Sequence, residues 1–197
     1  MNDSLYSYFC QADLSKNHRE KRRLFTKFIT LDPKYGLARA FLNLGLSYAE
    51  TNQPDSALFY YNIALLKDST YLFSYFHRGR LFSSTEKYDK AIKDFKQVIK
   101  MYPPFTAAYL ERGNCYLSIK DYNNALADFN KVIQMEPTND QAYMLRGVVY
   151  RQTEDYLIAI ENWKQAKKLN SLNADIADKL IDEVKVLIKE QKAKAKK

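Results

Sequence analysis

The chain has 197 residues, 46% of them hydrophobic and 27% charged, with a formal net charge of +8 at pH 7. This composition is typical of a folded protein, and no apolar run reaches the roughly 18 residues that a membrane-spanning helix needs. The two cysteines are too few for a disulfide framework or for a zinc site of four thiolates. The N-terminus shows no secretory signal, although a trimmed signal would leave the same sequence, so we expect a cytoplasmic protein.

The first 37 residues end in a segment with helical spacing of apolar side chains. Phe25, Ile29 and Leu31 occupy its apolar positions, and Pro33 follows them. Proline restricts the residue before it and favours the end of a helix there. We therefore expect residues 1–37 to form a helical N-terminal cap, or a diverged copy of the units that follow.

The central part of the chain repeats itself with a period of 34 residues. Four of the five glycines follow this spacing: Gly45, Gly79, Gly113 and Gly147. Aromatic residues recur four before, three after and sixteen after each of these glycines, and alanine recurs twelve after. These offsets predict two helices per unit, the first carrying the glycine and the second the alanine and the last aromatic. A glycine inside a helix costs about 1 kcal/mol relative to alanine, so we expect a side chain there to collide with the partner helix.

The period, the small residues, the aromatic positions and the prolines at Pro103 and Pro137 together resemble the tetratricopeptide repeat family. The resemblance implies an all-α fold, a right-handed superhelical α-solenoid of antiparallel helix pairs. It covers four consecutive repeats, at residues 38–71, 72–105, 106–139 and 140–173. It specifies the fold closely and the function only broadly, because the family is a scaffold that hosts many partners.

Two positions within the repeats vary together. The residue before the glycine is arginine in the last three repeats, and the residue before the last aromatic is then aspartate or asparagine. These positions lie on opposed helices of one repeat. We therefore expect ion pairs between Arg78 and Asp94 and between Arg112 and Asp128 that fix how the two helices pack.

The last segment, residues 174–197, is expected to form a C-terminal capping helix followed by a frayed basic tail. Its apolar positions keep helical spacing up to Glu190: Ile176, Leu180, Val184, Leu187 and Ile188. A solenoid needs such a cap to cover the apolar face of its last repeat.

The sequence offers no catalytic constellation. The only histidines are His18 and His77, and the HExxH, GxSxG and glycine-rich phosphate-binding motifs are all absent. Cys115 stands between two packing positions and is interpreted as a core residue rather than a nucleophile. We therefore expect no catalytic residues, no cofactor, no metal and no enzymatic activity.

Function is expected instead on the concave face that the resemblance assigns to the first helix of each repeat. That face would bind a peptide segment of a partner protein with hydrophobic anchors. The residues at its inner positions are Arg39, Leu42, Asn43, Leu46, Phe73, Phe76, His77, Arg80, Leu110, Glu111, Asn114, Met144, Leu145 and Val148. Phe73 and Phe76 are the expected anchors, because they add aromatic side chains beyond the regular packing set. Leu42, Leu110 and Met144 could equally be buried between helices.

The carboxylate clamp of the family's chaperone-tail binders is not expected here. Of its matching positions only Asn43, Arg80 and Asn114 are chemically suitable, and Glu111 would repel a carboxylate. Self-association of the aromatic-rich repeats remains open. The alternative function is association with nucleic acid or an anionic membrane surface through the basic segments 16–23 and 185–197, although such segments are more often solvated surface.

Overall fold

The structure is a computed structural model that describes residues 3–31 and 37–194. The backbone of these residues forms α-helices and one 3₁₀ turn, without a β-strand. In chain order they are α1 (Asp3–Leu14), α2 (His18–Leu31), α3 (Ala38–Glu50), α4 (Pro54–Lys67), α5 (Leu72–Ser84), α6 (Tyr88–Met101), α7 (Thr106–Ser118), α8 (Tyr122–Met135), α9 (Asp140–Gln152), α10 (Tyr156–Leu169), the 3₁₀ turn (Ser171–Asn173) and α11 (Ala174–Lys194). The all-helical prediction is confirmed.

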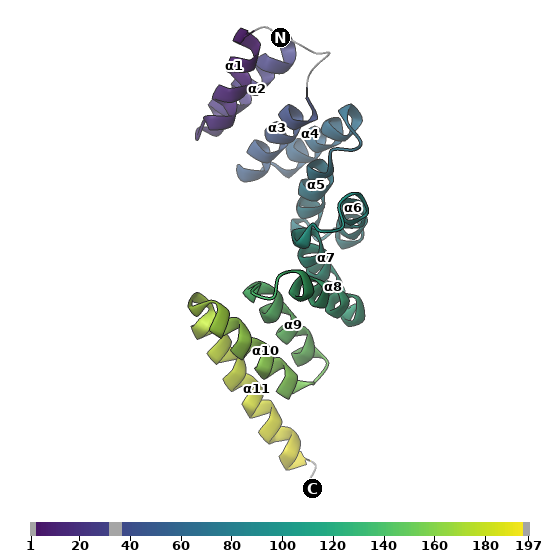
Figure 1. Ribbon diagram of the computed structural model, residues 1–197, viewed down its shortest axis with the longest axis vertical. Helices are drawn as coiled ribbons and strands as arrows, with labels where there is room; N and C mark the ends of the chain where they lie inside the picture. The colour runs from purple at the N-terminus through teal and green to yellow at the C-terminus, as the bar shows by residue number, and fades with distance from the viewer. Residues whose placement is uncertain (1–2, 32–36, 195–197) are drawn as a thin grey trace. The chain divides into compact units, whose positions relative to one another are not determined.

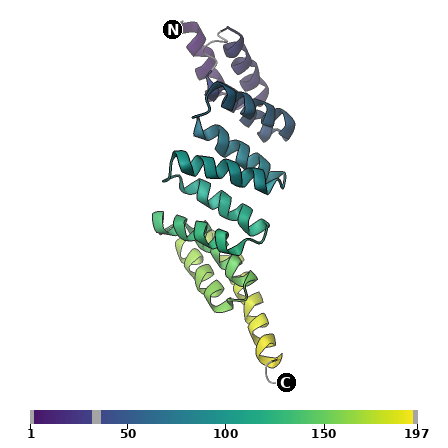
Figure 2. The same cartoon turned by 90° about the vertical axis from the view of Figure 1, so that its right-hand side faces the viewer.

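The helices group into two compact units, Met1–Pro103 with α1 to α6 and Pro104–Lys197 with α7 to α11 (Figure 1). Within each unit consecutive helices pair as hairpins: α1 with α2, α3 with α4, α5 with α6, α7 with α8, and α9 with α10. Figure 2 shows the same hairpins from another side. The boundary between the units falls at the only two consecutive prolines of the chain, neither of which can donate a backbone hydrogen bond.

Each glycine of the 34-residue period lies against an aromatic ring of its partner helix. A Cβ atom on Gly113 would lie 2.7 Å from Cε1 of Phe129, and one on Gly147 would lie 2.5 Å from Nε1 of Trp163. Both rings are fully buried, so neither can move aside. The predicted collision is therefore confirmed, and it explains why these helices carry glycine at its cost in helix propensity.

The two predicted ion pairs are also present. Arg78 donates from Nε and Nη2 to the two carboxylate oxygens of Asp94, each at 2.8 Å. Arg112 makes the same two-pronged contact with Asp128, at 2.8 and 2.6 Å. Both aspartates are buried, so each carboxylate receives from its arginine the hydrogen bonds that water would otherwise supply.

Arginine at this position also joins neighbouring hairpins. Nη1 of Arg78 donates to Oδ1 of Asn62 on α4, and Nη1 of Arg146 donates to Oδ1 of Asn130 on α8, each at 2.7 Å. One side chain thus links both helices of its own hairpin to the preceding hairpin.

The turn inside each of these hairpins has the same backbone geometry. One residue in each turn has a positive φ: Asn52 (55°), Glu86 (59°), Lys120 (62°) and Glu154 (64°). The following residue donates its N–H to a carbonyl oxygen five positions back, as from Lys87 to Phe82 at 2.8 Å. This is the Schellman ending of an α-helix, in which the left-handed position usually holds glycine. No glycine marks it here, and the sequence pattern did not reveal it.

The N-terminal hairpin has an aromatic core of its own. The ring of Phe9 on α1 meets those of Phe25 and Phe28 on α2 edge-on, with centroids 5.4 and 5.3 Å apart. Leu44 of α3 belongs to the same buried cluster, so the hairpin covers one side of the first repeat. We predicted that the N-terminal cap ends at residue 37. The residues just before this point, 32–36, lie outside the described residues.

At the other end, α11 packs against α10. Ala177, Ile181 and Val184 form a buried cluster with Ala159 and Trp163 of α10. Of the predicted apolar positions, Val184 is buried, and Leu180, Leu187 and Ile188 pack against this cluster, so the predicted face is confirmed except at Ile176.

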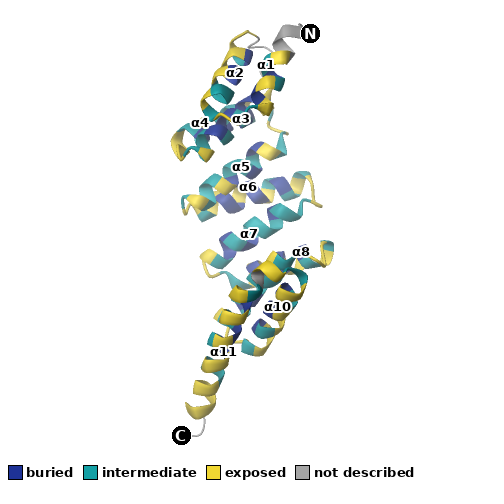
Figure 3. Ribbon diagram, turned by 90° about the vertical axis from the view of Figure 1, so that its left-hand side faces the viewer, coloured by how far each residue is buried: buried dark blue, intermediate teal, exposed yellow. Residues whose placement is uncertain are grey.

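Two expectations for this segment are corrected. Ile176, predicted to be apolar and covered, is 56% exposed because Ala177 takes the buried position. The helix also continues to Lys194 instead of fraying after Glu190, since glutamine, alanine and lysine all favour helix. Figure 3 shows that its C-terminal half is largely exposed.

Candidate functional site

The first unit contains a pocket of about 660 Å³ between the first helices of its two regular hairpins. We call it the α3–α5 pocket. It is lined by Leu46, Ala49, Glu50, Asn52, Pro54, Tyr61, His77, Arg80, Leu81, Ser84 and Thr85. Three of these, Leu46, His77 and Arg80, are among the residues predicted from their repeat positions.

Two rings form part of the pocket wall: the half-buried imidazole of His77 and the buried ring of Tyr61. The His77 imidazole lies 6.5 Å from the ring of Tyr61, centroid to centroid. Burial, together with the charge of Arg80, lowers the pKa of His77 to about 4. Burial also raises the pKa of Tyr61, with a further contribution from the charge of Glu50. At neutral pH the pocket therefore presents an uncharged imidazole and a protonated phenol, both able to hydrogen bond.

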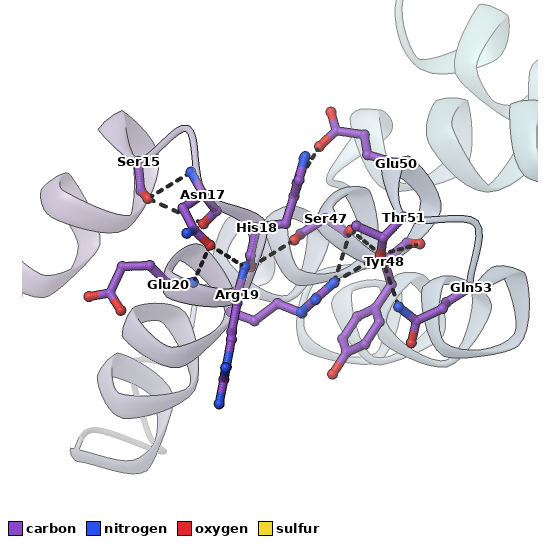
Figure 4. A network of polar contacts seen from close by, with 11 residues as sticks. Ser15, Asn17, His18, Arg19, Glu20, Ser47, Tyr48, Glu50, Thr51 and Gln53 are labelled. Carbon is purple, nitrogen blue, oxygen red and sulfur yellow. Dashed lines mark hydrogen bonds and ion pairs between the residues drawn. The ribbon is translucent and has the colours of Figure 1, made fainter.

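Charged groups of both signs border these rings. Arg80 is exposed on α5, and Glu50 is exposed at the end of α3, where its carboxylate lies 3.3 Å from Nδ1 of His18. Figure 4 shows that His18 and Glu50 belong to a polar network between the start of α2 and the end of α3. The pocket thus offers a negative and a positive group together with apolar wall.

The same network fixes α2 to α3. Nη1 of Arg22 donates to the carbonyl oxygen of Ser47 at 3.2 Å and to Oγ1 of Thr51 at 2.9 Å, and its guanidinium lies 4.7 Å from the ring centroid of Tyr48. The hydroxyl of Ser47 donates to the carbonyl oxygen of His18 at 3.3 Å. Arg22 belongs to the basic segment 16–23 and is used within the fold.

Two predicted groove residues are engaged by the N-terminal hairpin. Arg39 donates to Oδ2 of Asp13 at 2.8 Å, and Asn43 donates to Oδ1 of the same carboxylate at 3.1 Å. Asp13 is on α1, so this carboxylate comes from the chain itself. Arg39 and Asn43 therefore help to hold the N-terminal hairpin on α3.

Two other predicted groove residues are buried in the core: Leu42, for which burial was the alternative expectation, and Phe76, whose prediction as an anchor is corrected. Leu42 is 4% exposed within the cluster of α3 and α4, and Phe76 is 9% exposed, with its ring centroid 6.0 Å from that of Phe95. Phe76 therefore packs inside its hairpin and cannot anchor a partner. Phe73 is 42% exposed and lies edge-on to Tyr71, with centroids 5.7 Å apart.

The predicted groove residues of the second unit are all partly buried: Leu110, Glu111, Asn114, Met144, Leu145 and Val148. Met144 and Val148 pack against the buried cluster that α10 and α11 share. The carbonyl oxygen of Met144 also accepts a hydrogen bond from Nε1 of Trp163 at 3.1 Å. Their packing against the cluster explains why these two side chains are only partly exposed.

Sequence reasoning missed the far end of the pocket. Glu50 and Ser84 lie one helical turn after the predicted positions Leu46 and Arg80, on the same side of their helices. Extending the inner positions by that turn would have found both. Tyr61 was identified only as a packing aromatic, yet it is both packed and part of the wall.

Two further features bear on the class of protein. Among the described residues, no group of three or more histidine, cysteine and acidic side chains could hold a metal ion. None of the helices in the described part of the chain combines the length and the hydropathy that crossing a membrane requires.

The chain matches one family in sequence. A family model for the tetratricopeptide repeat matches residues 106–139, and a second model with the same description matches residues 38–66 and 74–105. No curated protein matches the chain in sequence.

Solved structures of repeat proteins have a similar fold. A crystal structure of MamA is 21% identical, with a TM-score of 0.75 over 89% of this chain and 96% of the MamA chain. YrrB, described as a TPR protein with an unusual peptide-binding site, is 18% identical, with a TM-score of 0.72 over 85% of this chain and 84% of its own. A tetratricopeptide repeat protein from Parabacteroides merdae is 16% identical, with a TM-score of 0.78 over 94% of this chain and 71% of its own.

At these identities the likeness concerns the fold. The 34-residue period, the glycine–aromatic contacts and the family matches within residues 38–139 all point the same way. The chain is a member of the tetratricopeptide repeat family.

Proposed function

We propose that this protein is a non-catalytic interaction scaffold that binds a peptide segment of a partner protein in the α3–α5 pocket. Tetratricopeptide repeats support protein–protein interaction in general. The observation that carries the more specific proposal is the pocket of about 660 Å³, where apolar wall, neutral rings and charges of both signs meet. Mostly apolar concave sites with a few polar groups are typical of ligand binding.

The lining indicates the kind of segment that would fit. Leu46 and Leu81 supply apolar wall for an aliphatic or aromatic side chain. An acidic group of the partner would be placed near Arg80, and a basic group near Glu50. The neutral imidazole of His77 can exchange a hydrogen bond with the partner backbone. We therefore expect a segment with an apolar residue flanked by charges.

Exposed and partly buried side chains outside the pocket extend the proposed surface. Phe73 at the start of α5 offers an exposed aromatic edge. On the second unit, Leu110, Glu111, Asn114 and Leu145 are candidate contacts for another part of a partner. These residues belong to the proposal as separate surfaces on their own units.

A selection of peptides from a random phage-displayed library on the full chain tests the proposal. The affinity of a selected peptide is then measured by fluorescence anisotropy for the wild type, for Arg80→Glu, and for Lys96→Glu as a control charge reversal on α6. Lys96 is exposed and outside the pocket. We expect Arg80→Glu to weaken binding about tenfold and Lys96→Glu to have little effect. Failure to select any peptide, or equal losses in both variants, would contradict the proposal.

A further inference from the structure

A second hollow, of about 550 Å³, lies between α10 and α11 in the second unit. We call it the α10–α11 hollow. Its lining residues are Lys164, Lys167, Lys168, Asp178, Ile181 and Lys185. Four lysines around one concave site repel one another, so their gathering calls for a reason beyond solubility.

The repeat frame does not require lysine at these positions. The position of Lys167 holds an apolar residue in the three preceding repeats: Leu65, Ile99 and Ile133. In the last repeat an ion pair takes the place of that apolar residue, since Nζ of Lys167 lies 2.5 Å from Oδ2 of Asp178 on α11. A polar contact thus replaces an apolar side chain between the two helices.

The other two lysines of α10 have counterparts in α6, where the same repeat positions hold Lys96 and Lys100. The positions of Lys164 and Lys168 hold Asn130 and Gln134 in α8, the corresponding helix of the preceding repeat. Neutral polar side chains therefore satisfy the structural needs of this position. What is particular to α10 is the neighbouring helix α11, whose Ile181 and Lys185 complete the hollow.

Two of the four lysines are neutralised by neighbouring carboxylates. Lys167 pairs with Asp178, and Lys185 pairs with Asp182 at 2.8 Å. Lys164 forms a third, longer ion pair with Glu161 at 4.0 Å, so the excess positive charge of the hollow lies mainly on Lys168 of α10.

Lys164 and Lys168 are both available to a partner. The side chain of Lys164 is 62% exposed, and its ion pair with Glu161 is long, with 4.0 Å between the nitrogen and the carboxylate oxygen. Lys168 is exposed and makes no ion pair within the residues that the structure describes. They stand one helical turn apart, so one acidic segment can reach both. Exposed lysines further along α11, at 189 and 192, share the side of Lys185 by helical spacing and extend the basic surface.

From this arrangement we propose that the α10–α11 hollow is a docking site for an acidic peptide segment of a partner protein. Lys164 and Lys168 would bind its carboxylates, while Ile181 supplies an apolar floor for one aliphatic side chain. This site is separate from the α3–α5 pocket and does not depend on it.

Two observations favour an acidic peptide over other polyanions. The carboxylates of Asp178 and Asp182 alternate with the lysines and would repel a continuous row of phosphates. No aromatic side chain lines the hollow, so it offers no ring on which a base could stack.

The test uses a fluorescein-labelled peptide of sequence Glu-Asp-Leu-Glu-Asp-Leu-Glu-Glu. Its uncharged counterpart has glutamine in place of each glutamate and asparagine in place of each aspartate. Binding to the full chain is measured by anisotropy at about 0.15 M salt. The variants are Lys164→Ala/Lys168→Ala and, as a control with the same loss of charge, Lys93→Ala/Lys96→Ala on α6. All four lysines are exposed, and thermal unfolding checks that both variants fold.

We expect saturable binding of the acidic peptide alone, weakened about tenfold in the α10 variant and less than about twofold in the α6 variant. Equal losses in the two variants would show that only net charge matters and would overturn the proposal. Absence of peptide binding would also overturn the proposal. This holds whether or not the chain binds phosphatidylserine vesicles or single-stranded DNA tightly.

Discussion

Arg112 on α7 and Asp128 on α8 form a two-pronged ion pair, with Nε and Nη2 of the arginine at 2.8 and 2.6 Å from the carboxylate oxygens. The carboxylate of Asp128 is almost fully buried. Removing it leaves the guanidinium of Arg112 without its partner in a largely buried site. We therefore expect Asp128→Ala to destabilise the fold by about 2–4 kcal/mol, measured by urea unfolding.

A matched exposed pair provides the control. Asp182 pairs with Lys185 but is 73% exposed, so Asp182→Ala should change stability by less than about 0.5 kcal/mol. Equal losses for Asp128→Ala and Asp182→Ala would show that burial does not govern the strength of these pairs.

The contact between Gly113 and Phe129 predicts that alanine, usually a better helix former, is harmful here. A Cβ atom on Gly113 would lie 2.7 Å from the buried ring, so we expect Gly113→Ala to cost about 2 kcal/mol in chemical denaturation. Adding Phe129→Leu should recover part of this loss, because the smaller side chain makes room. A rise in stability on Gly113→Ala would contradict the account.

Lys120 has a φ of 62°, a conformation that costs a side chain about 1 kcal/mol or more and costs glycine nothing. Lys120→Gly should therefore raise the free energy of unfolding by about 0.5–1 kcal/mol. Asn52 has the same conformation but is a residue type that tolerates it, so Asn52→Gly should gain less. A loss of stability in Lys120→Gly would refute this reasoning.

His77 makes stability depend on pH. Its pKa is lowered from 6.5 to about 4 because burial disfavours the charged imidazole, with the charge of Arg80 adding to the effect. Between these values the unfolded chain binds more protons than the folded one, so stability falls as pH falls from 6.5 to 4. We expect a loss of up to about 3 kcal/mol over this window, reduced by the partial exposure of the ring.

The difference between wild type and His77→Gln isolates this effect from the carboxylates. Urea unfolding at several pH values should show that the free energy of unfolding declines less steeply with falling pH for His77→Gln than for the wild type. Identical slopes for wild type and His77→Gln would exclude the buried imidazole as the cause.

The sequence predicted the features that recur with the 34-residue period. The glycine–aromatic contacts and the pairs of Arg78 with Asp94 and Arg112 with Asp128 follow from positions that repeat or vary together. Such patterns specify hairpin packing because each repeat meets the same geometric demand.

Features that depend on a particular neighbour were not predictable. Leu42, Phe76 and Leu110 share one repeat position, yet Leu42 and Phe76 are buried while Leu110 is only partly buried, so the position alone does not decide burial. The contact of Asp13 with Arg39 involves the N-terminal hairpin, where the period does not hold. The αL turns at residues such as Lys120 carry no glycine, so composition does not mark them.

Site-specific photo-cross-linking tests the central claim most directly. Benzoylphenylalanine is placed at Ser84, which lines the α3–α5 pocket, or at Lys96, which is exposed on α6. Both proteins are irradiated in a lysate of the source cells, and cross-linked partners are identified by mass spectrometry. The account predicts a partner joined through Ser84 and not through Lys96, whereas a partner joined equally from both positions, or only from Lys96, would contradict it.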